Sequence, residues 1–297
     1  MALRGQGVSV APQLHFAHAN GFPIASYRQF LAPLQNAAAV SVTDFIGHHP
    51  EFPVSDNWFH LCNQLIRDVE TVVERTGQPV HGIGHSLGGG LTFMASLQRP
   101  DLFRSATLLD VPLITFWEAT VFAVLKMTPW RDRVTPAGRA ARRRSVWPSQ
   151  QAAFDYMRAR ALFRQFPDSV LWDYVQAVTE PVTAADAGAD SVQTQGWMLR
   201  YRPEIEADIF RTYPTNWVRH YRRRHPDLQV VIGAETSLVR PHHVRLMQHK
   251  LDIPVYQARG GHLFPLEYPE LAADQLLTLL GLPAGHSPQP AAGVAYG

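Results

Sequence analysis

The sequence feature that most constrains the fold is the stretch 79–90, which reads Pro-Val-His-Gly-Ile-Gly-His-Ser-Leu-Gly-Gly-Gly. Its apolar first half is typical of a buried strand, and a helical pattern begins directly after Ser86. A sharp turn from strand to helix exposes a serine side chain, and Gly84 and Gly88 leave room around it. The helix beginning at Leu87 directs its unpaired N–H groups at the same place, where they can stabilise negative charge. Ser86 is therefore the candidate nucleophile, although a glycine-rich connection with an incidental serine would give the same pattern.

Length and composition favour one large α/β domain, or a core with an insertion. The chain has 297 residues, of which 46% are hydrophobic, and its formal net charge of +2 favours neither nucleic acid nor a membrane surface as a partner. Cys62 is the only cysteine, which excludes an internal disulfide and a cysteine metal cluster and fits a reducing compartment. No signal-like apolar segment precedes the first expected strand, and charged residues interrupt the apolar stretch 111–127. We therefore expect a cytoplasmic protein without a transmembrane helix.

Strands and helices alternate at both ends of the chain, which predicts a mostly parallel sheet flanked by helices. Strands are expected where apolar or β-branched residues run together, and helices where apolar residues recur three and four positions apart. The expected strands are 13–18, 38–44, the run before Gly84, 103–111, 228–232 and 253–258, and the expected helices are 26–34, 57–75, 87 up to Pro100, 241–251 and 268–280.

The alternation breaks between 112 and 226, where helical spacing is punctuated by prolines. We interpret 112–226 as a mostly helical insertion between two parts of a core, 8–111 and 227–282, and 283–297 as a disordered tail. The insertion holds 17 Lys and Arg against 11 Asp and Glu, and the remainder holds 10 against 14. Its arginine clusters, within 139–144 and 219–224, fit a solvated helix surface, or attraction of an anionic substrate or acidic lipid headgroups. No aromatic-interleaved motif accompanies them, so nucleic acid is not an expected partner.

Four motifs follow one another along the chain: His18-Ala19-Asn20-Gly21-Phe22-Pro23, Asp44-Phe45-Ile46-Gly47-His48, Gly84-His85-Ser86-Leu87-Gly88-Gly89, and Gly260-Gly261-His262 followed by Pro265-Leu266-Glu267-Tyr268-Pro269. Together they resemble the motifs of the α/β-hydrolase fold in its capped serine hydrolases of the esterase and lipase kind. The resemblance spans 13–280 except for the middle, and it implies an α/β-hydrolase fold, with a mostly parallel sheet flanked by helices and with 112–226 inserted as a helical cap over the site. The family usually begins with a hairpin, whereas this chain has room for one short strand at most ahead of Leu14, so we expect fewer than eight strands.

The resemblance implies acyl transfer by a triad of serine, histidine and acid. His262, in the loop after the last expected strand, would take the proton from Ser86 as it attacks a carbonyl and would deliver it to the leaving group. The backbone N–H groups of Phe22 and Leu87 would form the oxyanion hole. We expect the nearby His18 and His85 to pack or to form hydrogen bonds rather than to react.

The identity of the acid is open. The family usually carries it just after the strand that follows the cap, in a run like Gly-x-x-Asp, and here Thr236 stands at that position. Threonine cannot hold the charge that fixes the histidine tautomer. Asp110, at the end of the strand beside the one before Ser86, is the preferred replacement, because some members of the fold supply their acid from there. Glu235 is the alternative, although a shift of one residue moves the attachment point by about 3.8 Å and reverses its side on an extended backbone.

The serine at 86 also narrows the expected reaction, since dehalogenases and epoxide hydrolases of this fold have an aspartate there. Hydrolysis of carboxylic esters is the preferred prediction, and thioesters, lactones, amides or a C–C bond next to a ketone are the alternatives. A binding module that has lost turnover is the alternative from another class. The expected partner is a small acyl substrate, apolar or anionic, and the oligomeric state is left open.

No cofactor is expected. No metal is expected either, because His81 and His85 lie on a strand and a turn, where a spacing of four does not converge on one ion. An apolar acyl pocket is expected from aromatic residues of the insertion, namely Trp117, Phe122, Trp130, Phe163, Phe166 and Trp172.

Overall fold

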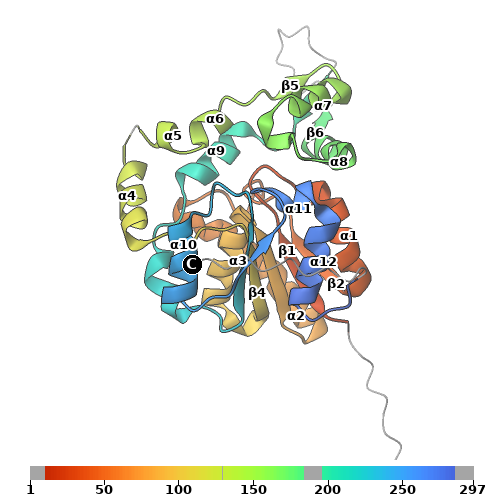
Figure 1. Ribbon diagram of the computed structural model, residues 1–297. Coiled ribbons are helices and arrows are strands. Elements are labelled where there is room, and N and C mark those ends of the chain that lie inside the picture. Colours follow the sequence, from red (N-terminus) through yellow and green to blue (C-terminus); the bar gives the residue numbers. More distant parts are fainter. Residues whose placement is uncertain (1–10, 129, 184–195, 285–297) are drawn as a thin grey trace, which may run out of the picture.

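A six-stranded parallel sheet is the centre of the computed structural model, which describes residues 11–128, 130–183 and 196–284 (Figure 1). The strand order is β2-β1-β3-β4-β8-β9, and every pairing is parallel. This confirms the α/β-hydrolase fold expected from the sequence, with fewer than eight strands in the described part of the sheet. The strands are β1 (Gln13–Ala17), β2 (Ala39–Thr43), β3 (Val80–His85), β4 (Phe103–Leu109), β8 (Leu228–Gly233) and β9 (Val255–Ala258).

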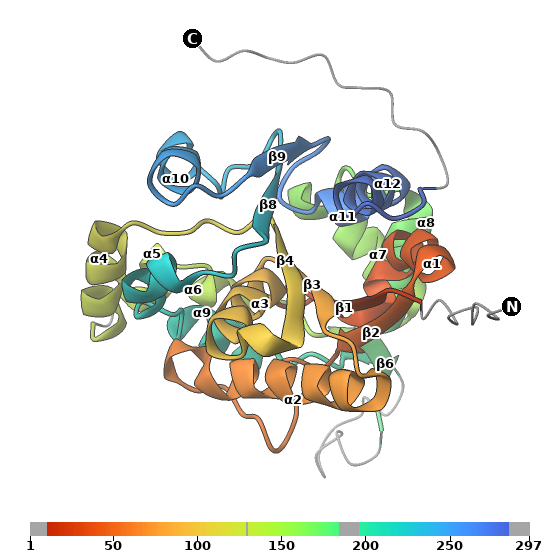
Figure 2. The same ribbon diagram turned by 90° about the horizontal axis from the view of Figure 1, so that it is seen from below.

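Helices cover both faces of the sheet (Figure 2). On one face α1 packs against α12, and on the other α2 packs against α3. Apolar side chains on the inner side of these helices meet the buried strands in two core clusters. The helices of the core are η1 (Ile24–Tyr27), α1 (Arg28–Ala37), η2 (Asp56–Trp58), α2 (Phe59–Thr76), α3 (Leu87–Gln98), η3 (Pro100–Leu102), α10 (Pro241–Arg245), the π-helical η6 (Leu246–Lys250), α11 (Phe264–Glu267) and α12 (Pro269–Leu279).

A buried histidine lies within the sheet, where an apolar residue is the norm. His15 on β1 contacts the hydroxyls of two β2 residues, Ser41 through Nδ1 and Thr43 through Nε2, both at 2.9 Å. Burial lowers the pKa of His15 to about 3, so the ring is neutral at physiological pH. Both ring nitrogens are thereby satisfied, which is the condition for burying such a group.

Residues 112–226, the inserted segment, connect β4 to β8. They are mostly helical, as expected, but they also form a small antiparallel sheet of order β5-β7-β6 that the periodicity did not indicate. Residues 184–195 of this segment lie outside the described residues, as do 8–10 of the expected core and 285–297 of the expected tail. The elements are α4 (Phe116–Lys126), α5 (Arg131–Val134), α6 (Ala137–Ala140), β5 (Val146–Trp147), α7 (Gln150–Arg158), η4 (Ala161–Phe163), α8 (Asp168–Val178), β6 (Thr179–Pro181), β7 (Trp197–Leu199), α9 (Pro203–Arg211) and η5 (Trp217–Arg223).

Within the described residues, no helix combines the length and the apolar character needed to cross a membrane.

Candidate active site

The turn between β3 and α3 holds Ser86 in a strained backbone conformation, with φ 53° and ψ −111°. The chain can turn this tightly only because its neighbours lack side chains. A Cβ on Gly84 would lie 2.2 Å from the Gly88 carbonyl oxygen, and one on Gly88 would lie 2.1 Å from the Ala17 oxygen. The backbone here therefore has the geometry of a nucleophile elbow, and the serine side chain remains partly exposed.

Three candidate residues from three strand ends lie in hydrogen-bond contact. His262, four residues after β9, has its Nε2 3.1 Å from the Ser86 Oγ. Its other nitrogen, Nδ1, is 2.7 Å from the Oδ2 of Asp110, which directly follows β4. Since the carboxylate can only accept, the Nδ1–H donates to it and Nε2 is left to accept the serine proton. The three side chains are thus connected in the order that a serine nucleophile, a base and an acid require.

The Asp110 carboxylate is fully buried and all its partners are donors. Its Oδ1 accepts the backbone N–H of Gly233 at 2.8 Å, and its Oδ2 accepts the Thr236 hydroxyl at 2.6 Å. Thr236, the residue at the usual acid position, therefore donates to the same oxygen that holds His262. Glu235, the alternative acid, is exposed, and its Oε2 accepts the side-chain amide of Gln165 at 3.2 Å. The geometry brings Asp110, and not Glu235, to His262.

A second buried histidine links the loops around the site. The Nε2–H of His85 donates to the carbonyl oxygen of His262 at 2.8 Å, and its Nδ1 accepts the Tyr27 hydroxyl at 2.7 Å. The Tyr27 oxygen in turn accepts the N–H of Ala19 at 3.2 Å. Burial, together with the nearby His262 ring, lowers the pKa of His85 to about 3, so the ring stays neutral and holds this pattern. The expected hydrogen-bonding role of His85 therefore has a definite set of partners.

Glu267 fixes the loop that carries His262, and sequence reasoning missed it. Its Oε2 accepts the N–H of Gly261, next to His262, at 2.6 Å. The same oxygen lies 2.4 Å from where a Cβ on Gly260 would stand, so the glycine is needed for this approach. Burial raises the pKa of Glu267, against the lowering effect of the Gly261 N–H. The signal available in the sequence was the position of Glu267 within the motif after His262.

In the turn after β1, the residue whose backbone N–H is free is not the expected one. The N–H of Phe22 donates to the Ala19 oxygen at 3.0 Å and so closes the turn itself. Among the described residues, the N–H groups of Asn20 and Leu87 have no such partner, and both residues line the same cavity as Ser86. The N–H of Gly88 donates to the His18 oxygen at 3.1 Å, which fixes this turn against the start of α3. Leu87 therefore fits its expected position, whereas Asn20 fits better than Phe22.

The inserted segment covers this turn. The Asn20 side chain donates to the Glu206 carbonyl on α9 at 3.0 Å, and the Phe22 ring lies 4.9 Å from the Tyr174 ring of α8. Phe163 and Phe166 join this aromatic cluster, with ring centroids 6.3 and 6.5 Å from that of Phe22. These two aromatics were expected in the substrate pocket, and instead they pack on the turn.

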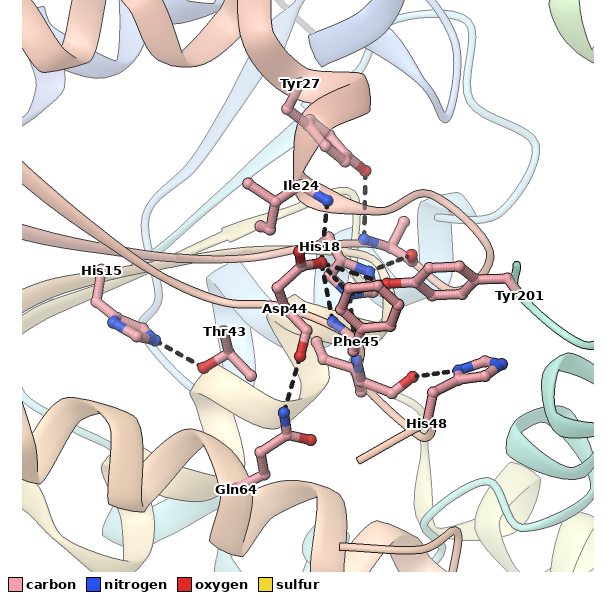
Figure 3. Close-up of polar contacts among 12 residues, drawn as sticks. His15, His18, Ile24, Tyr27, Thr43, Asp44, Phe45, His48, Gln64 and Tyr201 are labelled. Carbon is pink, nitrogen blue, oxygen red and sulfur yellow. Dashed lines mark hydrogen bonds and ion pairs between the residues drawn. The ribbon is translucent and has the colours of Figure 1, made fainter. Parts of the chain in front are cut away.

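A polar network connects the inserted segment to the loop after β2 (Figure 3). The Tyr201 hydroxyl donates to the Oδ1 of Asp44 at 3.2 Å, and that oxygen also accepts the N–H of Phe45 at 2.8 Å. His18 lies beside it, with Nδ1–H donating to the Ala19 oxygen at 2.8 Å and Nε2 accepting the Ile46 N–H at 3.3 Å. Burial lowers the pKa of His18. His18 therefore has the hydrogen-bonding role that the sequence predicted for it.

A cavity of about 540 Å³ opens at Ser86 between the core and the inserted segment. Its wall is mainly apolar, and its polar residues are Asn20, Ser86, Asp110, Glu118, Thr135, Ser237, Arg240 and His243. Of the six aromatics expected to line a pocket, Trp117 and Phe122 do so. The apolar part of the wall comprises Trp58, Leu87, Val111, Pro112, Ile114, Trp117, Val121, Phe122, Leu125, Pro136, Ile209, Phe210, Tyr213, Trp217 and Leu238.

One group among the described residues has the composition of a metal site, with Glu118 of α4 facing His242 and His243 of α10. The Oε1 of Glu118 is 2.9 and 3.0 Å from the two Nε2 atoms. The Nδ1 of His243, however, accepts the Arg240 N–H at 3.1 Å, so its Nε2 carries the hydrogen and donates to Glu118. That hydrogen occupies the position a metal would need, so we interpret the group as a hydrogen-bonded link between α4 and α10.

The charge of Glu118 is well stabilised in this link. Its Oε2 accepts the N–H and the hydroxyl of Thr115, at 2.8 and 2.9 Å, which caps α4. Burial alone would raise the pKa of Glu118, but these donors and the two histidines outweigh it and lower the pKa to about 2. The carboxylate is therefore ionised at any pH near neutrality.

Comparison with known proteins places these features in a family. A sequence model described as the alpha/beta hydrolase family matches residues 16–275. No curated protein matches the sequence. Identities below 25%, as in the three solved structures that follow, show the fold alone. The chain is similar to E-2-(acetamidomethylene)succinate hydrolase (20% identity, TM-score 0.66, 91% of each chain covered), to the thioesterase domain from the curacin biosynthetic pathway (16%, 0.63, 90% of this chain and 91% of that chain) and to an esterase of M. tuberculosis (16%, 0.62, 92% and 86%).

Proposed function

Because the chain belongs to the α/β hydrolase family, we propose that it is a serine hydrolase that cleaves carboxylic esters through an acyl-enzyme. The observation that carries the proposal is the continuous contact from Ser86 through His262 to the buried Asp110. A binding module without turnover would have no need of a strained serine facing a histidine in the accepting tautomer.

In the proposed reaction the Ser86 oxygen attacks the ester carbonyl while His262 Nε2 takes its proton. The negative Asp110 stabilises the imidazolium that forms, and the N–H groups of Asn20 and Leu87 stabilise the oxyanion. His262 then protonates the leaving alcohol and later activates a water that hydrolyses the acyl-enzyme. We assign the oxyanion role to Asn20 in place of Phe22, since the Phe22 N–H is already used within its turn.

The inserted segment is proposed to act as a cap that selects the acyl group. Its apolar wall, to which Trp117 and Phe122 contribute, has the size and character to hold an acyl chain of medium length. Acetate would leave most of this wall in contact with water, so longer acyl groups should gain binding from apolar burial. The similar structures include an esterase and a thioesterase domain, which is compatible with a carboxylic ester or a thioester as the bond cleaved.

The test uses a fluorophosphonate probe and a panel of p-nitrophenyl esters of increasing acyl length. The wild type should be labelled and should turn over, and Ser86→Ala and His262→Ala should each lower kcat on the order of 10⁴-fold without unfolding. Ser237→Ala is the matched control, because Ser237 lines the same cavity, whereas the hydrogen bonds of His262 are to Ser86, Asp110 and His85. Absent labelling of folded wild type, or more than about a tenth of wild-type activity in either variant, would refute the assignment.

A further inference from the structure

Helix α4 exposes large apolar side chains to an unusual extent. Phe116 and Val124 of α4 are 68% and 59% exposed, Met127 directly after the helix is 89% exposed, and Trp117 and Val121 of α4 are also exposed. Ala119 is the one residue of α4 that the structure buries. A helix that is apolar around most of its circumference normally lies in a core, in a membrane or against a partner. These five exposed residues, the α4 face, therefore need a covering surface.

The elements around α4 carry exposed arginines. Helix α4 packs on η5, its Glu118 binds the histidines of α10, and α5 follows it along the chain. Helices α4, α5, α10 and η5 together carry two acidic residues, and both are paired: Glu118 with His242 and His243, and Asp132 with Arg211. Nearby Asp56 pairs with Lys126 of α4 itself. The exposed arginines are Arg131 and Arg133 on α5, Arg219, Arg222 and Arg223 on η5, and Arg245 with the preceding Arg240 on α10.

The α4 face is continuous with the cavity. Trp117 and Val121 are exposed to solvent and also line the cavity that opens at Ser86. Figure 1 shows α4 at the outer edge of the inserted segment, beside α10, and away from β2 at the opposite edge of the sheet. A surface that covers the α4 face would therefore lie at the mouth of the site.

We propose that the α4 face docks on the surface of a lipid bilayer that contains anionic headgroups. Apolar and indole side chains partition into the interfacial region of a bilayer, and arginines around them attract acidic headgroups. A second copy of the chain is a poorer occupant, since a symmetric contact through this face would bring the two basic rims together. The docking goes beyond ester hydrolysis and does not depend on it.

The experiment is flotation of purified protein with vesicles of phosphatidylcholine alone and with added phosphatidylglycerol. The Ser86→Ala protein is used, so that binding is measured without turnover and its failure is distinct from failure of the proposed function. We expect it to float with the anionic vesicles, and to do so less as salt is raised. Protein that stays unbound at low salt would overturn the proposal.

Two sets of variants measure separately how much the apolar residues of the α4 face and the surrounding arginines contribute to binding. Phe116→Gln, Val124→Gln and Met127→Gln together should weaken binding at least tenfold, because these side chains do not line the cavity and lose only their apolar contact. Arg222→Gln with Arg223→Gln should weaken binding to anionic vesicles about tenfold. Leu271→Gln, at a residue of α12 that is 55% exposed, is the matched control and should bind as before.

Thermal melting shows that each variant is folded. Binding that neither set of variants changes would contradict the proposal. A concentration-dependent dimer that the α4 variants abolish, without vesicle binding, would assign the face to a second copy and would also overturn it. Binding to an acidic protein but not to vesicles would also overturn the proposal.

Discussion

Replacing Asp110 with asparagine tests the candidate triad at its least predictable member. The Oδ1 of Asp110 accepts the Gly233 N–H, and Oδ2 faces His262 and Thr236. An asparagine at position 110 can accept the Gly233 N–H only if its side-chain oxygen points toward Gly233. The opposite orientation would set two donors against each other in a fully buried site, at a cost of about 1–3 kcal/mol. The amide nitrogen of the new side chain would therefore face His262.

The size of the expected loss in kcat follows from the change in the tautomer of His262. With an amide N–H pointing at its Nδ1, His262 must accept there and carry its hydrogen on Nε2, the atom 3.1 Å from the Ser86 Oγ. It can then no longer take the serine proton. We expect kcat to fall on the order of 10⁴-fold, which is about 5.4 kcal/mol of activation free energy at about 1.36 kcal/mol per factor of ten.

The assay is the initial rate with a p-nitrophenyl ester for the wild type, Asp110→Asn and the control Glu235→Gln, which should lose less than about tenfold. Adding Thr236→Asp to Asp110→Asn should recover about tenfold or more, because the Thr236 hydroxyl lies 2.6 Å from the oxygen that holds His262. Near-normal turnover of Asp110→Asn, or collapse of Glu235→Gln, would refute the reasoning.

Three further predictions concern the surroundings of the site. Tyr27→Phe should lower the free energy of unfolding in urea by about 1–3 kcal/mol, because His85 Nδ1 and the Ala19 N–H lose their buried partner; a loss below about 0.5 kcal/mol would contradict it. Phe122→Trp should fill part of the cavity and shift the best p-nitrophenyl ester to a shorter acyl chain, and a variant whose highest kcat/KM stays at the wild-type chain length would count against the pocket. In the unfolded state His15 is protonated below its ordinary pKa of about 6.5, whereas in the folded state it is protonated only near pH 3, so the free energy of unfolding should fall as pH falls from about 6.5 to about 3. His15→Gln should reduce this dependence on pH by up to about 1.36 kcal/mol per pH unit, as measured by urea unfolding at several pH values. An unchanged dependence would be evidence against the buried neutral ring.

The parts of the fold that local pattern determines could be predicted from the sequence. Runs of apolar residues indicated the strands, and the glycines around Ser86 indicated the turn, because both depend on residues that are close together in the sequence. The choice between Asp110 and Glu235 depends on how the ends of β4 and β8 lie beside each other, which only tertiary structure specifies. Proximity in sequence to the usual acid position was the argument for Glu235, but its side chain is exposed and lies against Gln165.

The turn after β1 shows a second limit of sequence reasoning. Its motif predicted that this turn supplies an oxyanion donor but not which N–H is free, since that depends on a hydrogen bond between Phe22 and Ala19 within the turn. In the same way, the spacing of Phe163 and Phe166 predicted apolar contact without specifying whether they face substrate or Phe22. The folded arrangement of the backbone and of distant side chains decides both questions.

The buried chain of bonds from Ala19 through Tyr27 and His85 to the carbonyl of His262 has a consequence for local unfolding. It joins the loops that follow β1 and β9 through two side chains buried from water, Tyr27 of η1 and His85 at the end of β3. An opening that frees the Ala19 amide breaks the Tyr27 contact and removes a support of the loop that holds His262. The loops after β1 and β9 should therefore open together in hydrogen exchange, with a common protection, and not one by one as surface loops do.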